Sequence, residues 1–332
     1  MNLVRVVEDP EIYLLRVPFP HKPHKKTNIY IAVKGGECLL IDVGCGGDAP
    51  FAFVEAALES LGFANAPLNV FLTHLHPDHA GLLPYLAQAH RASVIMGEES
   101  YRSLLLARKA GCSEGKGWEY LRQNGLPPSD IAAIKETDLA PTVLFDTASV
   151  QAIADRDMLE RAGCMLQAVS LRGHAPGHMG LHEKSSNVLF SGDHLLFDVS
   201  PALQSSFIPQ NGLDLYIEDL HKICSMAPTL LLHAHGELLN DYVERAQWLI
   251  CHQTERKLEV LKVIRKNPNL TGMEVAQRLR WNTPTQNLRS LPLYLRVCVL
   301  ETAMVCINQL VHDKLVSRVF SASEGSFRYL PS

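Results

Sequence analysis

Residues 71–81 carry four side chains able to bind a metal ion within a span of six positions. The segment reads Phe-Leu-Thr-His-Leu-His-Pro-Asp-His-Ala-Gly and contains His74, His76, Asp78 and His79. Neutral imidazoles and carboxylates are the ligands that zinc prefers, with manganese and ferrous iron as alternatives. A single His-x-His pair arises by chance on many surfaces, but four such ligands so close together do not. The cluster therefore predicts a metal site.

The cluster directly follows residues 68–72, an apolar run with the length and composition of a buried strand. In α/β proteins, sites are usually built at the carboxyl ends of strands. Three later motifs likewise follow apolar runs, so we expect all of these side chains to meet at one edge of a sheet sandwich. The motifs are Gly173-His-Ala-Pro-Gly-His178, Ser191-Gly-Asp193-His194 and His233-Ala-His235-Gly.

The composition indicates a globular protein with one large domain or two ordinary ones. The chain has 332 residues, of which 47% are apolar and 20% charged. It lacks an apolar stretch near the ~20 residues of a membrane span, and its acidic N-terminus does not resemble a signal peptide. The eight cysteines form no Cys-x-x-Cys pair. We therefore expect reduced thiols, a cytoplasmic location and no membrane association.

The pattern of apolar residues predicts two similar halves rich in strands, with helices between them. This order favours an α/β sandwich in which two sheets pack together beneath outer helices. Residues 98–139 differ, being mostly helical, and we interpret them as an insertion over a pocket. Strands are expected over 12–17, 27–33, 38–43, 68–72, 92–96, 142–146, 149–153, 164–170, 179–182, 187–191 and 229–233, and helices over 50–61, 81–90 and 214–226.

From about residue 240 the pattern becomes helical. Thr271 and Glu274 have the spacing of a capping box, which marks a helix start. Three helices followed by a hairpin are the element order of a winged helix. We therefore divide the chain into a catalytic domain, residues 1–240, and a C-terminal winged-helix-like domain, residues 241–332. The expected helices cover 242–265, 271–280 and 293–313, and the hairpin covers 316–320 and 327–330.

These motifs resemble those of the metallo-β-lactamase superfamily of hydrolases. The match is to its His-x-His-x-Asp-His signature and to its Gly-His-x-Pro-Gly-His, Ser-Gly-Asp and Gly-His-Gly-like elements, and covers most of residues 10–240. The resemblance implies an α/β fold of the αββα four-layer type with a two-metal site at one edge. It also implies that His74, His76 and His178 bind the first metal, that Asp78, His79 and His235 bind the second, and that Asp193 bridges both.

This ligand set suits catalysis. Five histidines and two aspartates give two divalent ions three or four protein ligands each, which leaves room for a bridging water. We expect Zn2+, with Fe2+ or Mn2+ as alternatives. Two ions about 3.5–4 Å apart can lower the pKa of that water toward ~7, and the resulting hydroxide would attack a carbonyl carbon or phosphorus. Asp78, beside the water, can carry its proton to the leaving group.

Several nearby polar residues have alternative interpretations. His235 is preferred over His233 as a ligand because it directly precedes a glycine, as in the family pattern. His174 and His194 are either donors to the ligands or substrate contacts, or they are ordinary hydrogen-bonded loop histidines. Asp42 ends a predicted strand, and the resemblance implies that it supports the site loop.

At several positions this chain differs from known branches of the superfamily, and these differences argue against the activities of those branches. The flavodiiron branch has Glu where this chain has His76, and the zinc β-lactamases proper have Cys where it has Asp193. Quorum-signal lactonases carry Tyr where Leu196 stands. Residues 194–201, with the insertion and the C-terminal domain, most resemble the lactamase-β-like relatives of glyoxalase II. Those relatives include thioesterases and a single-strand endoribonuclease.

Three hypotheses follow: a hydrolase of small-molecule thioesters or esters, a single-strand endoribonuclease, and a mononuclear iron persulfide dioxygenase. Residues 250–332 have a charge balance of +6, against −10 for the rest of the chain, which supports a nucleic-acid partner. However, the third predicted helix is apolar on most sides, whereas a groove-reading helix needs polar and basic residues. We expect it to be buried at an interdomain or homodimer surface, and we favour the small-molecule substrate.

Overall fold

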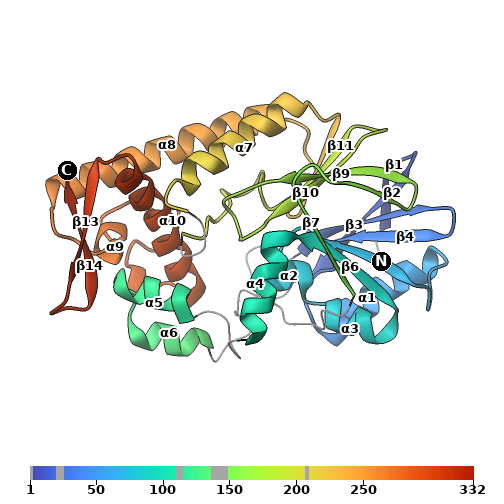
Figure 1. Cartoon of the computed structure of the whole chain (residues 1–332), viewed down its shortest axis with the longest axis horizontal. Coiled ribbons are helices and arrows are strands. Elements are labelled where there is room, and N and C mark those ends of the chain that lie inside the picture. Colours follow the sequence, from blue (N-terminus) through green and yellow to red (C-terminus); the bar gives the residue numbers. More distant parts are fainter. Residues whose placement is uncertain (1–2, 20–25, 110–114, 136–148, 206–208) are drawn as a thin grey trace.

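The computed structural model describes residues 3–19, 26–109, 115–135, 149–205 and 209–332. Two β-sheets pack face to face, and helices cover their outer faces (Figure 1). This is the predicted αββα four-layer sandwich, so the predicted fold class is confirmed.

The first sheet contains seven strands in chain order. Its first four strands are antiparallel neighbours, and its last four are parallel, with helices in the connections. The strand before the metal cluster, β5, therefore lies inside the sheet between β4 and β6. The strands are β1 (Leu3–Val7), β2 (Glu11–Pro18), β3 (Lys26–Lys34), β4 (Glu37–Ile41), β5 (Leu68–Leu72), β6 (Ala92–Gly97) and β7 (Val150–Ile153), and the helices on this side are α1 (Asp48–Ser60), α2 (Pro77–Ala80), α3 (Leu83–Ala89) and α4 (Glu98–Lys109).

The second sheet has five strands in the order β12-β11-β10-β9-β8. All neighbours are antiparallel except β11 and β12, which are parallel and so end at the same edge. Helix α7 (Gly212–Met226) connects these two strands. The strands are β8 (Met158–Arg161), β9 (Cys164–Ser170), β10 (Met179–Glu183), β11 (Val188–Gly192) and β12 (Leu230–His233).

Alternation of side chains along the strands produces three apolar layers. One layer lies between the sheets, where Phe71 and Phe190 are buried and the Tyr30 ring meets that of Phe190 edge to face at 5.4 Å. Residues on the opposite face of the first sheet pack against α1, α3 and α4. The third layer joins the outer face of the second sheet to α7 and to the C-terminal helices.

The insertion is helical over its described parts, as predicted. The expected strand at 142–146 lies outside the described residues. The C-terminal elements follow in the predicted order, and Thr271 and Glu274 form the predicted capping box. These elements lie at the opposite end of the molecule from α1 and α3 (Figure 1). The C-terminal elements are α8 (Tyr242–Lys266), α9 (Gly272–Ala276), the 3-10 turn η1 (Leu288–Ser290), α10 (Leu293–His312), β13 (Val316–Ser321) and β14 (Ser326–Pro331). The insertion contributes α5 (Gly115–Gln123) and α6 (Pro128–Lys135) after α4.

Helix α10 is a core helix. Among the described residues it alone is long and apolar enough to cross a membrane, but 61% of its most apolar stretch is buried. Leu300, Ala303 and Ile307 are fully enclosed and belong to the same core as α7 and α8. The helix therefore joins the C-terminal region to the second sheet instead of presenting a basic face.

Candidate metal centre

The predicted motifs meet at one edge of the sandwich. His74 and His76 follow the end of β5, and Asp78 and His79 lie in the short helix α2, which begins at Pro77. The other motifs occupy the β9–β10 loop and the ends of β11 and β12. Because β5 is buried and parallel to its neighbours, its carboxyl end directs these polar side chains to a common edge.

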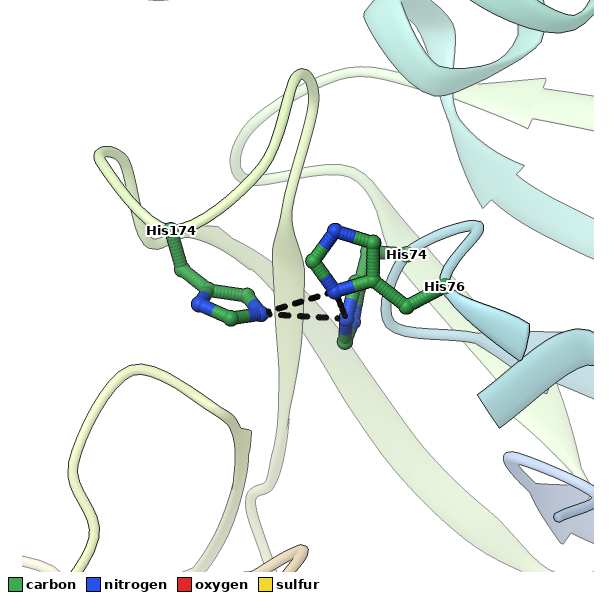
Figure 2. A group of neighbouring side chains, drawn as sticks. All are labelled: His74, His76 and His174. Atoms are coloured by element: carbon green, nitrogen blue, oxygen red, sulfur yellow. Dashed lines mark hydrogen bonds between the residues drawn. The ribbon is translucent and has the colours of Figure 1, made fainter. Parts of the chain in front are cut away.

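Three imidazoles form the first ligand group, shown in Figure 2. The Nε2 atom of His74 lies 2.8 Å from Nδ1 of His76, and Nε2 of His174 lies 3.2 Å and 3.0 Å from those two atoms. Nitrogens bound tetrahedrally to one zinc at about 2.0–2.1 Å are themselves about 3.3 Å apart. The triangle therefore fits a single zinc-sized ion.

The third histidine of this group differs from the sequence prediction, which gave His178. His178 is buried, but its Nε2 accepts a hydrogen bond from the backbone N–H of Asp193 at 3.1 Å. A neutral imidazole has one ring nitrogen with a free lone pair, and in His178 that lone pair is already used. The structure therefore groups His174, and not His178, with His74 and His76. His178 instead contacts the backbone of Asp193.

Hydrogen bonds fix which nitrogen of each imidazole is free to bind metal. The Thr73 hydroxyl donates to the Asp42 carboxylate at 2.8 Å, so its oxygen accepts from Nδ1 of His74 at 3.0 Å. The Ala202 carbonyl accepts from Nδ1 of His174 at 2.7 Å. In both rings the proton therefore lies on Nδ1 and the Nε2 lone pair points into the group. Contacts to the outer nitrogen of a metal-binding histidine usually fix its tautomer in this way.

A second ligand group contains Asp78, His79 and His235. His235 Nε2 lies 3.5 Å from a carboxylate oxygen of Asp78. His79 donates from Nδ1 to the Asp42 carboxylate at 2.7 Å, leaving its Nε2 buried and without a hydrogen-bond partner among the described residues. His235 donates from Nδ1 to the Lys26 carbonyl at 3.2 Å. Both imidazoles thus present Nε2 to the same space as the Asp78 carboxylate.

Asp193 lies between the two groups. Its Oδ2 atom is 3.3 Å from Nε2 of His174, whereas Oδ1 is 3.5 Å from Nε2 of His79 and 3.4 Å from Nε2 of His235. Gly192 precedes it with φ +52°, and a Cβ there would approach His178 Nε2 to 2.7 Å. A larger residue would therefore displace the contact that holds Asp193.

Electrostatics differ between the two groups. Burial lowers the pKa of His74 well below its usual value, an effect that neighbouring imidazoles reinforce, and burial also lowers the pKa of His174. Burial lowers the pKa of His235 too, but the Asp193 carboxylate leads the opposing effects that raise it to about 9. At His79, too, burial lowers the pKa, but the Asp193 and Asp42 carboxylates together outweigh it, and the pKa lies well above its usual value. The imidazoles of His74 and His174 are thus neutral, whereas the second group attracts positive charge.

The remaining histidines of the motifs point elsewhere. His233 donates from Nδ1 to the carbonyl of His235 at 2.7 Å, and its ring packs against Phe197. His194 is fully buried against Tyr216, and neither of its ring nitrogens has a hydrogen-bond partner among the described residues. The structure thus brings His235, and not His233, to the carboxylates. The tertiary contact from Gln204 to His76 was not predicted by any motif.

The fold and the site together define the family. Residues 24–235 match the family model of the Metallo-beta-lactamase superfamily, and the chain therefore belongs to that superfamily. This confirms the resemblance at the level of the superfamily. Its placement near glyoxalase II stays a prediction.

Individual relatives are distant but cover much of the chain. The Beta-lactamase-like protein 2 homolog of Caenorhabditis elegans is 24% identical over 87% of this chain and 80% of its own length. An atrochrysone carboxyl ACP thioesterase of Emericella nidulans is 25% identical over 76% of this chain and 66% of its own. A crystal structure of a metallo-beta-lactamase family protein from Thermus thermophilus has a TM-score of 0.78 and 25% identity, covering 97% of this chain and 98% of that one.

Proposed function

We propose that this protein is a hydrolase that uses two divalent metal ions to cleave a thioester or ester of a small molecule. The first ion would be held by the first ligand group and the second ion by the second group. Asp193 would contribute one carboxylate oxygen to each. The proposed ligands are His74, His76 and His174 for the first ion and Asp78, His79 and His235 for the second.

The position of Asp193 is the observation that carries this proposal. One of its oxygens lies 3.3 Å from the first group and the other 3.4–3.5 Å from the second, near the ~3.3 Å expected between ligands of one ion. Imidazole-rich ligation favours zinc, with Fe2+ or Mn2+ as alternatives. When bound, two such ions lower the pKa of a water between them and polarise the substrate carbonyl.

The side chains supply orientation and proton transfer. Asp78 lies at the start of α2, with its side chain nearly buried, beside His235. As the water oxygen adds to the carbonyl carbon, Asp78 would accept the water's proton. It would then pass that proton to the sulfur or oxygen of the departing group as the carbon–sulfur or carbon–oxygen bond breaks.

A thioester substrate is supported by the relative from Emericella nidulans, whose name gives a thioesterase acting on an acyl carrier protein. A nucleic-acid substrate has less support. The helix that would read a groove, α10, is largely buried, and the basic side chains of α8 are balanced by the acidic remainder of the chain. The mononuclear iron alternative needs ligands for one ion only and leaves the second group, Asp78, His79 and His235, without a role.

A substrate panel tests the proposal. Zinc-loaded protein would be assayed against acyl-CoA, acyl-glutathione and aryl esters, beside Asp78→Ala and a control, Asp157→Asn, in the exposed β7–β8 turn. We expect turnover of at least one thioester or ester that Asp78→Ala lacks and Asp157→Asn retains. If no substrate is turned over above the Asp78→Ala background, the ester and thioester assignment is wrong. One iron and no zinc per chain in isolated protein would favour the dioxygenase.

A further inference from the structure

A loop between the bridging carboxylate and the C-terminal half of the chain contacts the first ligand group. This loop, residues 196–205, has no helix or strand. Its Ala202 carbonyl accepts from Nδ1 of His174 at 2.7 Å. The side-chain amide nitrogen of Gln204, Nε2, lies 2.8 Å from Nε2 of His76. Two of the three imidazoles of the first group are therefore oriented by this one loop.

Metal binding by His76 decides which partner must donate and which must accept in its contact with Gln204. His76 faces the first group through Nδ1, so its ligand form carries the ring proton on Nε2. In the structure the amide nitrogen of Gln204 faces this atom. When His76 binds a metal, the amide must therefore be turned to present its oxygen, which accepts that proton. The amide can do so, because rotation by 180° exchanges its oxygen and nitrogen within the same space. With its oxygen in that place, Gln204 would fix both the ring orientation and the tautomer of His76.

The other side of the loop is held by helix α8. The Arg245 guanidinium donates to the carbonyls of Leu196 and Val199, each at 2.6 Å. Further along the helix, the buried Gln253 donates to the hydroxyl of Ser200 at 3.1 Å. Side chains of one helix therefore hold the loop at three points.

Helix α10 holds the end of the loop next to Gln204. The hydroxyl of Ser205 donates to the carboxylate of Glu301, and both side chains are buried. A carboxylate enclosed in a core helix is expensive to leave without donors, so this contact strongly restricts where the loop can lie. The metal-facing contacts and the C-terminal anchors thus belong to the same short segment.

We propose that Gln204 is a positioning residue for His76, and that helices α8 and α10 set the affinity of the first metal ion by holding the loop that carries Gln204 and Ala202. This inference rests on the proposed two-ion site. It gives the C-terminal region a role in metal binding besides enclosing a substrate. Contacts of this kind typically contribute about 10- to 100-fold to metal affinity.

The test of Gln204 is a zinc titration of the full chain against a chromophoric chelator, repeated in an Asp78→Asn background to identify the first ion. We expect Gln204→Leu to weaken that ion about 10- to 100-fold. Gln204→Glu should retain tight binding, because its carboxylate still accepts from Nε2 of His76. Equal loss in both variants would show that His76 does not need an accepting oxygen from Gln204, and no loss in either would show that Gln204 only fills space. Either result would overturn its positioning role.

The test of the C-terminal anchor uses two arginines of the same helix. Arg245 and Arg256 each donate to backbone carbonyls and each lie over a tryptophan ring, at 4.3 Å and 4.6 Å from its centre, but only Arg245 holds the loop. We expect Arg245→Met to weaken the first ion several-fold, up to about 10-fold. Arg256→Met should bind it as the wild type does. Equal binding by both variants would contradict the coupling.

Two readouts separate this inference from the proposed function. Thermal unfolding of the metal-free variants shows whether any loss of zinc reflects loss of the fold. Wild-type protein that takes up two ions, with all variants binding alike, would overturn only the positioning role. Wild-type protein that takes up no ion at these histidines would overturn the two-ion site, and this inference with it.

Discussion

The two ligand groups lie side by side but are constructed differently. The first contains only imidazoles, and their outer nitrogens contact neutral groups, namely a threonine hydroxyl, a backbone carbonyl and an amide. The second contains a carboxylate ligand, and the Asp42 carboxylate supports His79. Negative charge is therefore concentrated around the second group. We expect the first ion to depend on geometry and the second on the negative charge that surrounds it.

The largest effect should come from removing the charge shared by both groups. Asp193→Asn keeps the size of the side chain but removes its negative charge. We expect metal content to fall from two ions to one per chain and turnover to fall at least about 100-fold, because the site loses electrostatic stabilisation. Metal analysis and steady-state kinetics on the same preparation check this. A variant that keeps two ions and normal turnover would contradict the proposal that Asp193 binds both ions.

The next effect distinguishes the two histidines of the β9–β10 loop. His174→Ala should lose the first ion, with affinity reduced about 100-fold or more, because a direct ligand is absent. His178→Ala should retain both ions with affinity reduced about 10-fold, since it only supports Asp193. Zinc titration of the two variants side by side is the measurement. The opposite ranking would restore the ligand set that the sequence predicted.

A smaller effect tests the support of the second group. Asp42 has a left-handed backbone, φ +59°, which asparagine tolerates well, so Asp42→Asn should fold. We expect it to weaken the second ion about 10-fold, since a neutral amide supports His79 less well than a carboxylate. The titration should show less change at the first ion. A larger loss of affinity for the first ion than for the second would contradict the proposal that Asp42 mainly supports the second group.

The smallest effect concerns the base of the loop that carries His174. Asp219 is buried and accepts from the guanidinium and the backbone N–H of Arg172 at 2.7 Å. Burial raises the pKa of Asp219, but the hydrogen bonds from Arg172 and Lys222 outweigh it and hold the pKa below its ordinary value. We expect Asp219→Asn to lower the free energy of unfolding by about 1–2 kcal/mol at pH 7.

The pH dependence of that difference follows from the sign of the shift. A carboxyl whose pKa is lower in the folded state stabilises the fold above its unfolded pKa of about 4, and this contribution disappears as the pH falls through the folded value. Denaturant unfolding of metal-free wild type and Asp219→Asn should therefore converge in acid. A difference that persists undiminished at about pH 2 would mean that the ion pair is not its source.

Much of the fold and the site could be predicted from local patterns. The strand before His74 is an almost continuous apolar run. The cluster of metal-binding side chains that follows it indicates where the site lies. The strands β1 and β8 were not predicted. Both lie at the edge of their sheets and bury few side chains, so their sequences lack the continuous apolar run of a central strand. Helix α10 was recognised as buried because it is apolar on most sides.

The choice between His174 and His178 could not be made locally. Both lie in one glycine-bracketed loop, and what separates them is a hydrogen bond from the backbone of Asp193, which is distant in sequence. Gln204 was missed for the same reason, since a lone glutamine in an irregular loop has no motif. Direct ligands gather in recognisable clusters, whereas the residues that orient them are found only once the chain has folded.

A crystal structure of zinc-loaded protein, with anomalous scattering recorded at the zinc edge, tests the two-ion site most directly. We expect two peaks. One should lie about 2.0–2.1 Å from ring nitrogens of His74, His76 and His174, and the other among Asp78, His79 and His235, with Asp193 touching both ions. A single peak, or a first ion bound to His178 in place of His174, would contradict this expectation.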